Sequence, residues 1–472
     1  MKIGSDFTIR NQKSVEFLKV LLIVSIILIP VDNLPYLSNL LGELSVRGTV
    51  YPFILIILLI AYYSFKEKEI YFVKDIEIKF LLLFLAWVFL CTLINIPGVL
   101  DNHFKGRSGI SKVVLQFMVI GFVVLVSYCT DIIIYLNKLT LKKIRKYILF
   151  SLIPVFIYGT IELINLLNLI DMSKVLEGLS NIFQTYHRGE VYTKGIRTIT
   201  GEVSYFGMYA SFVMPWIASY LFTEKGLKNK LKYGAVFSYL LILLLFSKSR
   251  TAYAIILLQI CLFTLFILVF KVNKVIKRNL IIGVVSLGVI FTIMNSTVLN
   301  KYSGDVNSVN KISIKTLANS LMDPNNMSNI ARSGMQMAAI EMGKDNPIFG
   351  VGVGQYGFLA KDYVTEKAKT SNEVQRWIDG NEEAWSPAFS LYPRIIAEEG
   401  FVGIILWIAF LGLILYRAIK KLWKKENDII GISLVVSFIG ILIAWFNADT
   451  FAQMSFWVML PIIIRYNNSR IN

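Results

Sequence analysis

The stretch NPIFGVGVGQYGF, residues 346–358, carries Gly352, Gly354 and Gly357 at the G-x-G-x-x-G spacing that often cradles the pyrophosphate of a dinucleotide. Glycines suit this chemistry because their backbone turns tightly and can approach a phosphate closely. A dinucleotide loop must also leave a buried strand and open a helix, with an acidic residue roughly 20 positions later. The elements around residues 346–358 therefore decide whether this is a cofactor site.

Histidine and cysteine give little basis for a metal or disulfide site. His103 and His187 are the only histidines and lie far apart in the sequence, which argues against a histidine-based metal site. Cys91, Cys129 and Cys261 all lie in strongly apolar stretches, so we expect them to fill the core. The sequence predicts neither a bound metal nor a disulfide framework.

Long apolar runs dominate the chain, in which 56% of 472 residues are hydrophobic. These runs reach the length of about 17 residues or more that is needed to cross a hydrocarbon core roughly 30 Å thick. They predict an all-α integral membrane protein with about twelve transmembrane helices. The first run lacks a small-residue cleavage site, so we interpret it as a retained helix. The predicted spans are 15–31, 49–65, 80–98, 113–130, 147–170, 203–222, 231–247, 251–270, 279–299, 395–416, 429–447 and 450–466.

The net charge of +17 follows the positive-inside pattern of such proteins. With the N-terminus inside, the basic clusters at 138–146, 224–232, 271–278 and 416–425 all lie on the cytoplasmic side. Membrane topology explains this charge, so the sequence predicts the lipid bilayer as a partner and no nucleic acid.

Two outer segments are unusually long, 171–202 and 300–394, and they divide the chain into regions 1–299, 300–394 and 395–472. Within the second, NMSNIARSGMQMAAIEMGKDNP predicts a helix capped near Ser328 or Asn329 and stopped at Asn346 and Pro347. The glycines thus follow a helix and face a compartment without nicotinamide cofactors, which argues against a dinucleotide site. Tight packing of the backbone, or a phosphate-bearing ligand held by backbone N–H groups, remains as the interpretation.

Four stretches in order resemble the O-antigen polymerase and ligase superfamily, which includes the Wzy-type polymerases and the Wzy_C ligases. They are RTITGEVSYFGMYASFVMPW, LLLFSKSRTAYAIILL, ARSGMQMAAIEMGKDNPIFGVGVGQYGF and SLYPRIIAEEGFVGIILWIAF. The ligases of this superfamily carry a His-Asn pair just before the last motif, whereas this chain has Phe389 and Ser390. The resemblance therefore implies a GT-C-like polymerase rather than a ligase.

The resemblance implies transfer of a growing glycan from undecaprenyl diphosphate to a sugar hydroxyl of another lipid-linked unit, at the outer face of a bacterial cytoplasmic membrane. The product would be O-antigen, capsule or exopolysaccharide. Such an enzyme needs no cofactor and no metal, and a flippase and a chain-length regulator of the same pathway are possible partners. An O-antigen ligase is the nearest alternative, and a flippase or transporter is the alternative from another class. A peptidoglycan polymerase would suit the topology but not the four motifs.

A departing diphosphate calls for fixed arginine side chains, and each matching motif supplies one. Arg197 and Arg250 are the predicted catalytic arginines, while Arg332 and Arg394 are predicted to bind diphosphate or glycan. Arg250 is the most telling, because it and Lys248 occupy a short outer turn against the positive-inside bias. Lys248, Gly352, Gly354 and Tyr356 complete the predicted substrate-binding residues.

Glu202 is the first candidate for the general base, since it lies five residues after Arg197 at the mouth of the sixth predicted span. It can equally be a structural partner of an arginine. The other candidates are Asp379, Glu382, Glu383, Glu398, Glu399 and His187, for which surface or helix-entry roles are the simpler interpretation. Among the outer aromatic residues, Tyr186, Tyr192, Tyr356, Trp377 and Trp385 could stack on sugar rings or belong to an interface belt.

Overall fold

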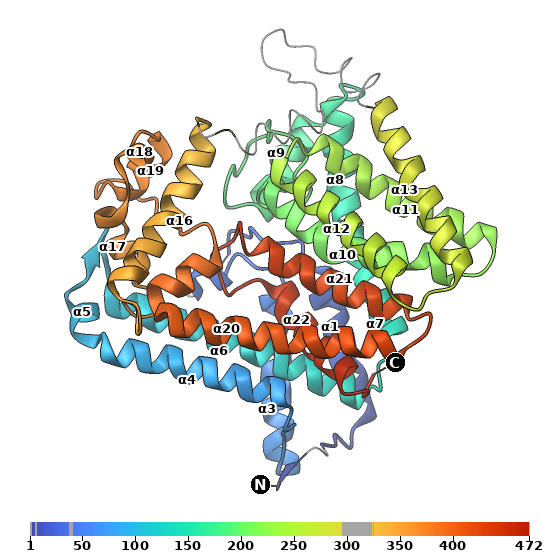
Figure 1. The fold of residues 1–472 in the computed structure, drawn as a ribbon, viewed down its shortest axis with the longest axis horizontal. Coiled ribbons are helices and arrows are strands. Elements are labelled where there is room, and N and C mark those ends of the chain that lie inside the picture. The colour runs from blue at the N-terminus through green and yellow to red at the C-terminus, as the bar shows by residue number, and fades with distance from the viewer. Residues whose placement is uncertain (1, 5–6, 37–40, 295–322, 324, 472) are drawn as a thin grey trace.

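The computed structural model describes residues 2–4, 7–36, 41–294, 323 and 325–471. This part of the chain is mostly helical, with two very short sheets (Figure 1). Strand β1 (Lys2–Gly4) pairs in parallel with β2 (Glu69–Tyr71), and β3 (His103–Phe104) pairs antiparallel with β4 (Arg107–Ser108). The structure agrees with the predicted all-α membrane class.

The helices follow the order expected from the hydrophobic runs. The first half contains α1 (Gln12–Ile27), the 3-10 helix η1 (Gly42–Leu44), α3 (Val50–Glu67), α4 (Ile76–Ile94), α5 (Ile96–Asp101), α6 (Gly109–Leu136), α7 (Leu141–Phe150), α8 (Leu152–Leu166) and α9 (Ser173–Phe183). The second half contains α10 (Val203–Thr223), α11 (Leu227–Phe246), α12 (Arg250–Val269), α13 (Lys274–Met294), α16 (Met327–Asp345), α17 (Tyr356–Tyr363), α18 (Glu366–Lys369), α19 (Asn372–Ile378), α20 (Leu391–Lys424), α21 (Ile429–Ala444) and α22 (Met454–Asn467).

Each predicted span coincides with helical structure, but the count of twelve crossings is not confirmed. Among the described residues, seven helices are long and apolar enough to cross a membrane: Val50–Glu67, Ile76–Ile94, Gly109–Leu136, Leu141–Leu166, Leu227–Phe246, Arg250–Val269 and Leu391–Lys424. Others are shorter, such as α21 with 16 residues and α22 with 14. The end of the ninth predicted span and residues 300–322 of the large loop lie outside the described residues. The chain is a multi-pass membrane protein.

Helix α10 is the centre of the fold, because every residue from Phe206 to Tyr220 is buried. It packs against α11, α12 and α21. Gly207 permits a close approach to α12, since a Cβ atom there would lie 2.5 Å from the Cβ of Ala252. The starts of α10 and α12 therefore lie together, each next to one of the recognised arginine motifs.

The outer segment after residue 325 has a hydrophobic cluster of its own, built on α16 to α19 (Figure 1). Helix α16 confirms the predicted helix, although it begins slightly earlier, because the side chain of Asn326 accepts hydrogen bonds from the N–H groups of Ser328 and Asn329. On its other side α16 packs against α20.

The glycine motif packs against a break in α20. Gly400 interrupts this helix with a φ of 72°, and the N–H groups of Val351 and Gly352 donate to the carbonyl groups of Ala397 and Glu398 at 2.9 Å each. A Cβ atom on Gly350 would lie 2.4 Å from the carbonyl carbon of Glu398. The sequence left two interpretations of the glycine motif, tight backbone packing and a phosphate-bearing ligand. The structure accounts for the motif by close backbone packing.

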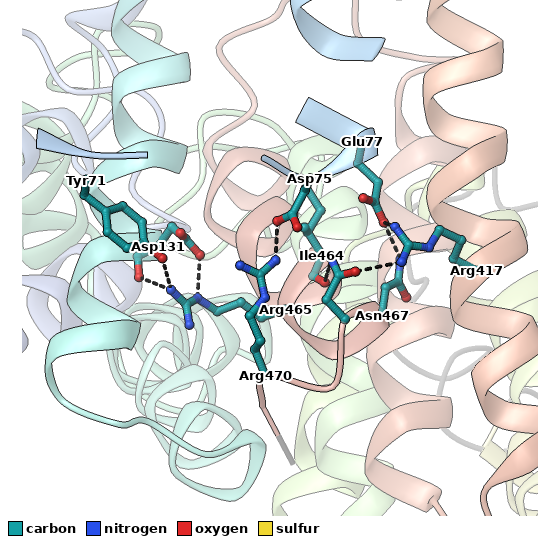
Figure 2. A network of polar contacts seen from close by, with 10 residues as sticks. Tyr71, Asp75, Glu77, Asp131, Arg417, Ile464, Arg465, Asn467 and Arg470 are labelled. Atoms are coloured by element: carbon teal, nitrogen blue, oxygen red, sulfur yellow. Dashed lines mark hydrogen bonds and ion pairs between the residues drawn. The ribbon is translucent and has the colours of Figure 1, made fainter. Parts of the chain in front are cut away.

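A polar network joins the helix ends that the charge pattern assigns to the cytoplasmic side (Figure 2). Arg465 of α22 is bonded to Asp131 of α6 and donates to the hydroxyl group of Tyr71 at 2.7 Å. Arg417 of α20 pairs with Glu77 of α4 at 2.7 Å, and Arg470 pairs with Asp75. These charge-assisted hydrogen bonds hold α22 against α6 and α20 against α4.

The cysteines do not all fill the core as expected. Cys91 and Cys129 are buried, but Cys261 of α12 is exposed. The expectation is wrong for Cys261 because none of the described residues covers that side of α12.

Candidate active site

A cavity of about 860 Å³ lies at the helix ends opposite to the network of Figure 2. Helix α22 connects the two, since Met454 at its start lines the cavity and Arg465 at its end belongs to the network. Segments distant in sequence form the walls: residues 29–32, residue 47 and segments 192–209, 248–251, 328–336, 373–389 and 447–455. All of them are loops or helix ends that the sequence assigns to the outer side.

Lys248, Arg250 and Arg332 form a basic part of the cavity lining, which we call the basic wall. The turn Ser247–Lys248–Ser249 joins α11 to α12, with Lys248 at a φ of 53° and the Ser249 side chain accepting from the N–H group of Ala252. This turn places both Lys248 and Arg250 at the cavity. The short turn that the sequence predicted around Lys248 and Arg250 is thereby confirmed.

Arg332 of α16 faces the same space as Arg250. Its guanidinium group donates to the side-chain oxygen of Asn447 at 3.2 Å and lies 5.5 Å from the ring of Phe389. Burial lowers the pKa of Arg332, the carboxylate of Glu373 opposes this shift, and the positive charge of Arg250 lowers the pKa further. Two guanidinium groups that repel each other across a cavity are suited to an anion bridging them.

Carboxylates line the same cavity. Glu202 directly precedes α10, lines the cavity and accepts a hydrogen bond of 3.0 Å from the hydroxyl group of Tyr192. Asp32, in the loop after α1, and Asp449, before α22, also line it. The carboxylate of Asp449 accepts the N–H group of Ala388 at 2.6 Å. The cavity therefore combines cations that could hold an anion with carboxylates that could accept a proton.

Arg197, predicted as catalytic, is not among the residues that line the cavity. Its side chain is only 1% exposed, pairs with Glu162 of α8 at 4.0 Å and donates to the carbonyl group of Gly201 at 3.3 Å. The guanidinium group also lies 4.5 Å from the ring of Tyr192, whose hydroxyl group contacts Glu202. Arg197 thus supports Tyr192 and the segment that leads to Glu202.

Arg394, predicted to bind substrate, is also not among the residues that line the cavity. It pairs with Glu398 at 3.2 Å, donates to the side chain of Gln116 at 2.9 Å and donates to the carbonyl group of Asp449 at 2.6 Å. The bond to Asp449 holds the backbone of a residue that lines the cavity, and the bonds to Glu398 and Gln116 hold Arg394 itself in place. Glu398 is consequently engaged as the partner of an arginine.

Gly352, Gly354 and Tyr356 do not line the cavity either. Gly352 and Gly354 have φ values of 92° and 76° and lie against residues of α4 and α6. Tyr356 is buried, and its hydroxyl group donates to the carbonyl group of Met335 at 2.8 Å. In the described structure these three residues support the outer segment.

The remaining candidate bases lie away from the cavity. Asp379 and Glu383 are exposed, while Glu382 and His187 form surface ion pairs with Arg376 and Glu190. Glu399 is fully buried, and neither of its carboxylate oxygens has a hydrogen-bond partner within the described part of the chain.

Of the five aromatic candidates, Tyr192 and Trp377 line the cavity, whereas Tyr186, Tyr356 and Trp385 do not. Trp385 instead packs against Phe104 and Phe358 with ring centroids 6.0 and 5.0 Å apart. No grouping of three or more His, Cys, Asp or Glu side chains that could hold a metal ion occurs among the residues that the structure describes.

Sequence reasoning missed Asp32, Arg47, Lys194 and Asp449, all of which line the cavity. Asp32 and Asp449 stand in short segments between predicted spans, in LIPVDNLPYL and NADT. Their only signal is a charged side chain in a short outer loop, and many such residues are merely solvated.

Comparison with known proteins supports the superfamily that the sequence motifs indicated. No curated protein matches the chain. The sequence model described as O-antigen ligase (Wzy_C) matches residues 235–408, which include Lys248, Arg250 and Arg332. The match supports glycan transfer of the O-antigen ligase and polymerase type as the general activity. It confirms that this chain resembles the O-antigen polymerase and ligase superfamily.

Proposed function

We propose that this protein polymerises lipid-linked oligosaccharide repeat units, using the 860 Å³ cavity as its active site. The observation that carries the proposal is that one cavity is lined both by the cations Arg250 and Arg332 and by the carboxylates Asp32 and Glu202. Transfer of a glycan from a lipid diphosphate requires both, since negative charge develops on the departing diphosphate while the acceptor hydroxyl loses a proton.

Arg250 and Arg332 bind the diphosphate of the donor. Planar guanidinium groups form paired hydrogen bonds with phosphate oxygens, and the repulsion between the two arginines is relieved when an anion lies between them. Lys248, in the turn before Arg250, adds a third positive charge from the same wall. This arrangement stabilises the leaving group through protein cations, so the proposed reaction requires no metal.

The acceptor sugar lies near Glu202 and Asp32, which supply hydrogen-bond acceptors for its hydroxyl groups. Tyr192 presents an aromatic ring beside Glu202, and Trp377 presents one beside Phe389. Arg197 and Arg394 act as positioning residues, since each holds a segment that carries a cavity residue. The charge pattern of the sequence assigns all these loops to the outer side, which favours chemistry at the outer face of the cytoplasmic membrane.

The position of Phe389 favours polymerisation over ligation. Phe389 lines the cavity beside Arg332, whereas the side chain of Ser390 donates to the carbonyl group of Trp445 at 3.0 Å. The ligases that the sequence resembles have a His-Asn pair here, and this chain cannot supply an imidazole at that place.

The test is reconstitution of the purified protein in proteoliposomes with undecaprenyl-diphosphate-linked repeat units. We expect a ladder of lipid-linked products longer than one repeat unit, together with release of undecaprenyl diphosphate. Transfer of one unit to a lipid A core acceptor without a ladder would establish a ligase instead. Movement of the lipid across the bilayer without any covalent product would establish a flippase and overturn the proposal.

A further inference from the structure

Asp32 faces the cavity next to Glu202 and is held from two sides. It is located in the loop between α1 and η1, and its side chain is 12% exposed. One carboxylate oxygen accepts the N–H group of Gly201 at 2.7 Å, and the other lies 3.6 Å from the guanidinium group of Arg47. Gly201 directly precedes Glu202, so these bonds hold Asp32 close to the segment that carries Glu202. The side chains of Asp32 and Glu202 both line the cavity.

The backbone on both sides of Asp32 is tied to other segments. The carbonyl group of Val31 accepts the N–H group of Gly48 at 2.7 Å. The side chain of Asn33 donates to the side chain of Gln184 at 2.7 Å, and its carbonyl group accepts the N–H group of Thr185 at the same distance. Asp32 therefore sits on a fixed backbone, and a proton acceptor held in place at the reacting atoms costs little reorganisation.

Glu202 lines the same cavity as Asp32 and is assigned here to the binding of the acceptor sugar. One of its carboxylate oxygens accepts a hydrogen bond from the hydroxyl group of Tyr192, whose ring lies 4.5 Å from the guanidinium group of Arg197. A general base must take up a proton and release it to water in every turnover.

The charges around Asp32 suit proton uptake near neutral pH. Burial raises the pKa of Asp32 to about 6, while Arg47, the N–H group of Gly201 and Arg197 oppose the increase. Tyr205 of α10 faces both Asp32 and Asp449, so these groups complete the titratable surroundings. A base is most effective when its pKa lies close to the working pH.

We propose that Asp32 is the general base of the polymerisation, an inference that rests on the proposed function. In the step, the acceptor hydroxyl oxygen forms a bond with the anomeric carbon of the donor glycan, and the bond from that carbon to the phosphate oxygen breaks. The electron pair leaves with the lipid diphosphate, which Arg250 and Arg332 stabilise. The hydroxyl proton passes to the carboxylate of Asp32 and then to water.

The experiment measures polymerisation by Asp32→Asn, with Glu202→Gln and the exposed Glu190→Gln as matched carboxylate-to-amide variants. The amide oxygen of Asn can still accept the N–H group of Gly201. We expect kcat of Asp32→Asn to fall about a hundredfold or more, as for loss of a general base, with little change in the donor KM. The wild-type kcat should rise as pH increases through about 6, and this rise should be absent in Asp32→Asn but retained in Glu202→Gln.

Arg47→Gln provides a second measurement that does not depend on the fold of Asp32→Asn. Arg47 lowers the pKa of Asp32, so its removal should move the rise in kcat to higher pH. An unchanged pH profile in Arg47→Gln, or a full rate in well-folded Asp32→Asn, would overturn the inference about Asp32. The proposed function would remain supported in that case, provided that the wild-type protein forms polymer. If wild-type protein formed no ladder, the proposed function itself would fail.

Discussion

Arg250 offers the sharpest test of the basic wall, through the change Arg250→Ala. Its side chain lies at the cavity and reaches Asn326, 3.5 Å away, at the start of α16. Asn326 also caps α16 through two backbone N–H groups, so the helix retains its cap in the variant. We therefore expect normal membrane levels and an unchanged unfolding temperature.

The expected loss of activity follows from the number of cations that remain. Arg332 and Lys248 still face the cavity, so the variant loses one charge-assisted contact to the diphosphate rather than all of them. Removing one such stabiliser costs about 3 to 4 kcal/mol in the transition state, which corresponds to roughly a hundredfold to a thousandfold in rate. Arg250→Lys should recover only part of this, since an ammonium group cannot form a paired contact with two phosphate oxygens.

The assay is the length distribution of surface polysaccharide on gels, together with the rate of ladder formation by purified protein. Arg376→Ala is the matched control, because Arg376 is 65% exposed in the same outer segment and its ion pair with Glu382 is a surface contact. Polymer of normal length and amount from well-expressed Arg250→Ala would refute the role of Arg250 in charge stabilisation.

Three further predictions follow from the same structure. Arg197→Ala should lower the unfolding temperature in detergent, because breaking a buried ion pair typically costs about 3 to 5 kcal/mol, and an unchanged temperature would contradict its positioning role. EDTA should leave ladder formation intact, whereas loss of activity that magnesium or manganese restores would show that protein cations alone do not neutralise the leaving group. Asn372→Cys, in a background without Cys91, Cys129 and Cys261, should react with an impermeant maleimide in intact spheroplasts, and reaction only after permeabilisation would reverse the topology.

The sequence determined those features that depend on neighbouring residues. Apolar runs predicted where helices form, since helix length and hydropathy are local properties. The turn at Lys248 was predicted for the same reason, from its place between two apolar runs. The helix that became α16 was predicted from a cap near Ser328 or Asn329 and from the stop at Pro347. Motif order also indicated the superfamily, which the match at residues 235–408 supports.

The tertiary structure decided which charged side chains meet. Arg197 and Arg250 looked alike in the sequence, as arginines in outer motifs, yet one is buried against Glu162 and the other lines the cavity. Asp32 carried no motif, because its place beside Gly201 is created by contacts between segments 169 residues apart. Burial and long-range charge set the behaviour of a carboxylate, and both arise only when the loop after α1 meets the segment before α10.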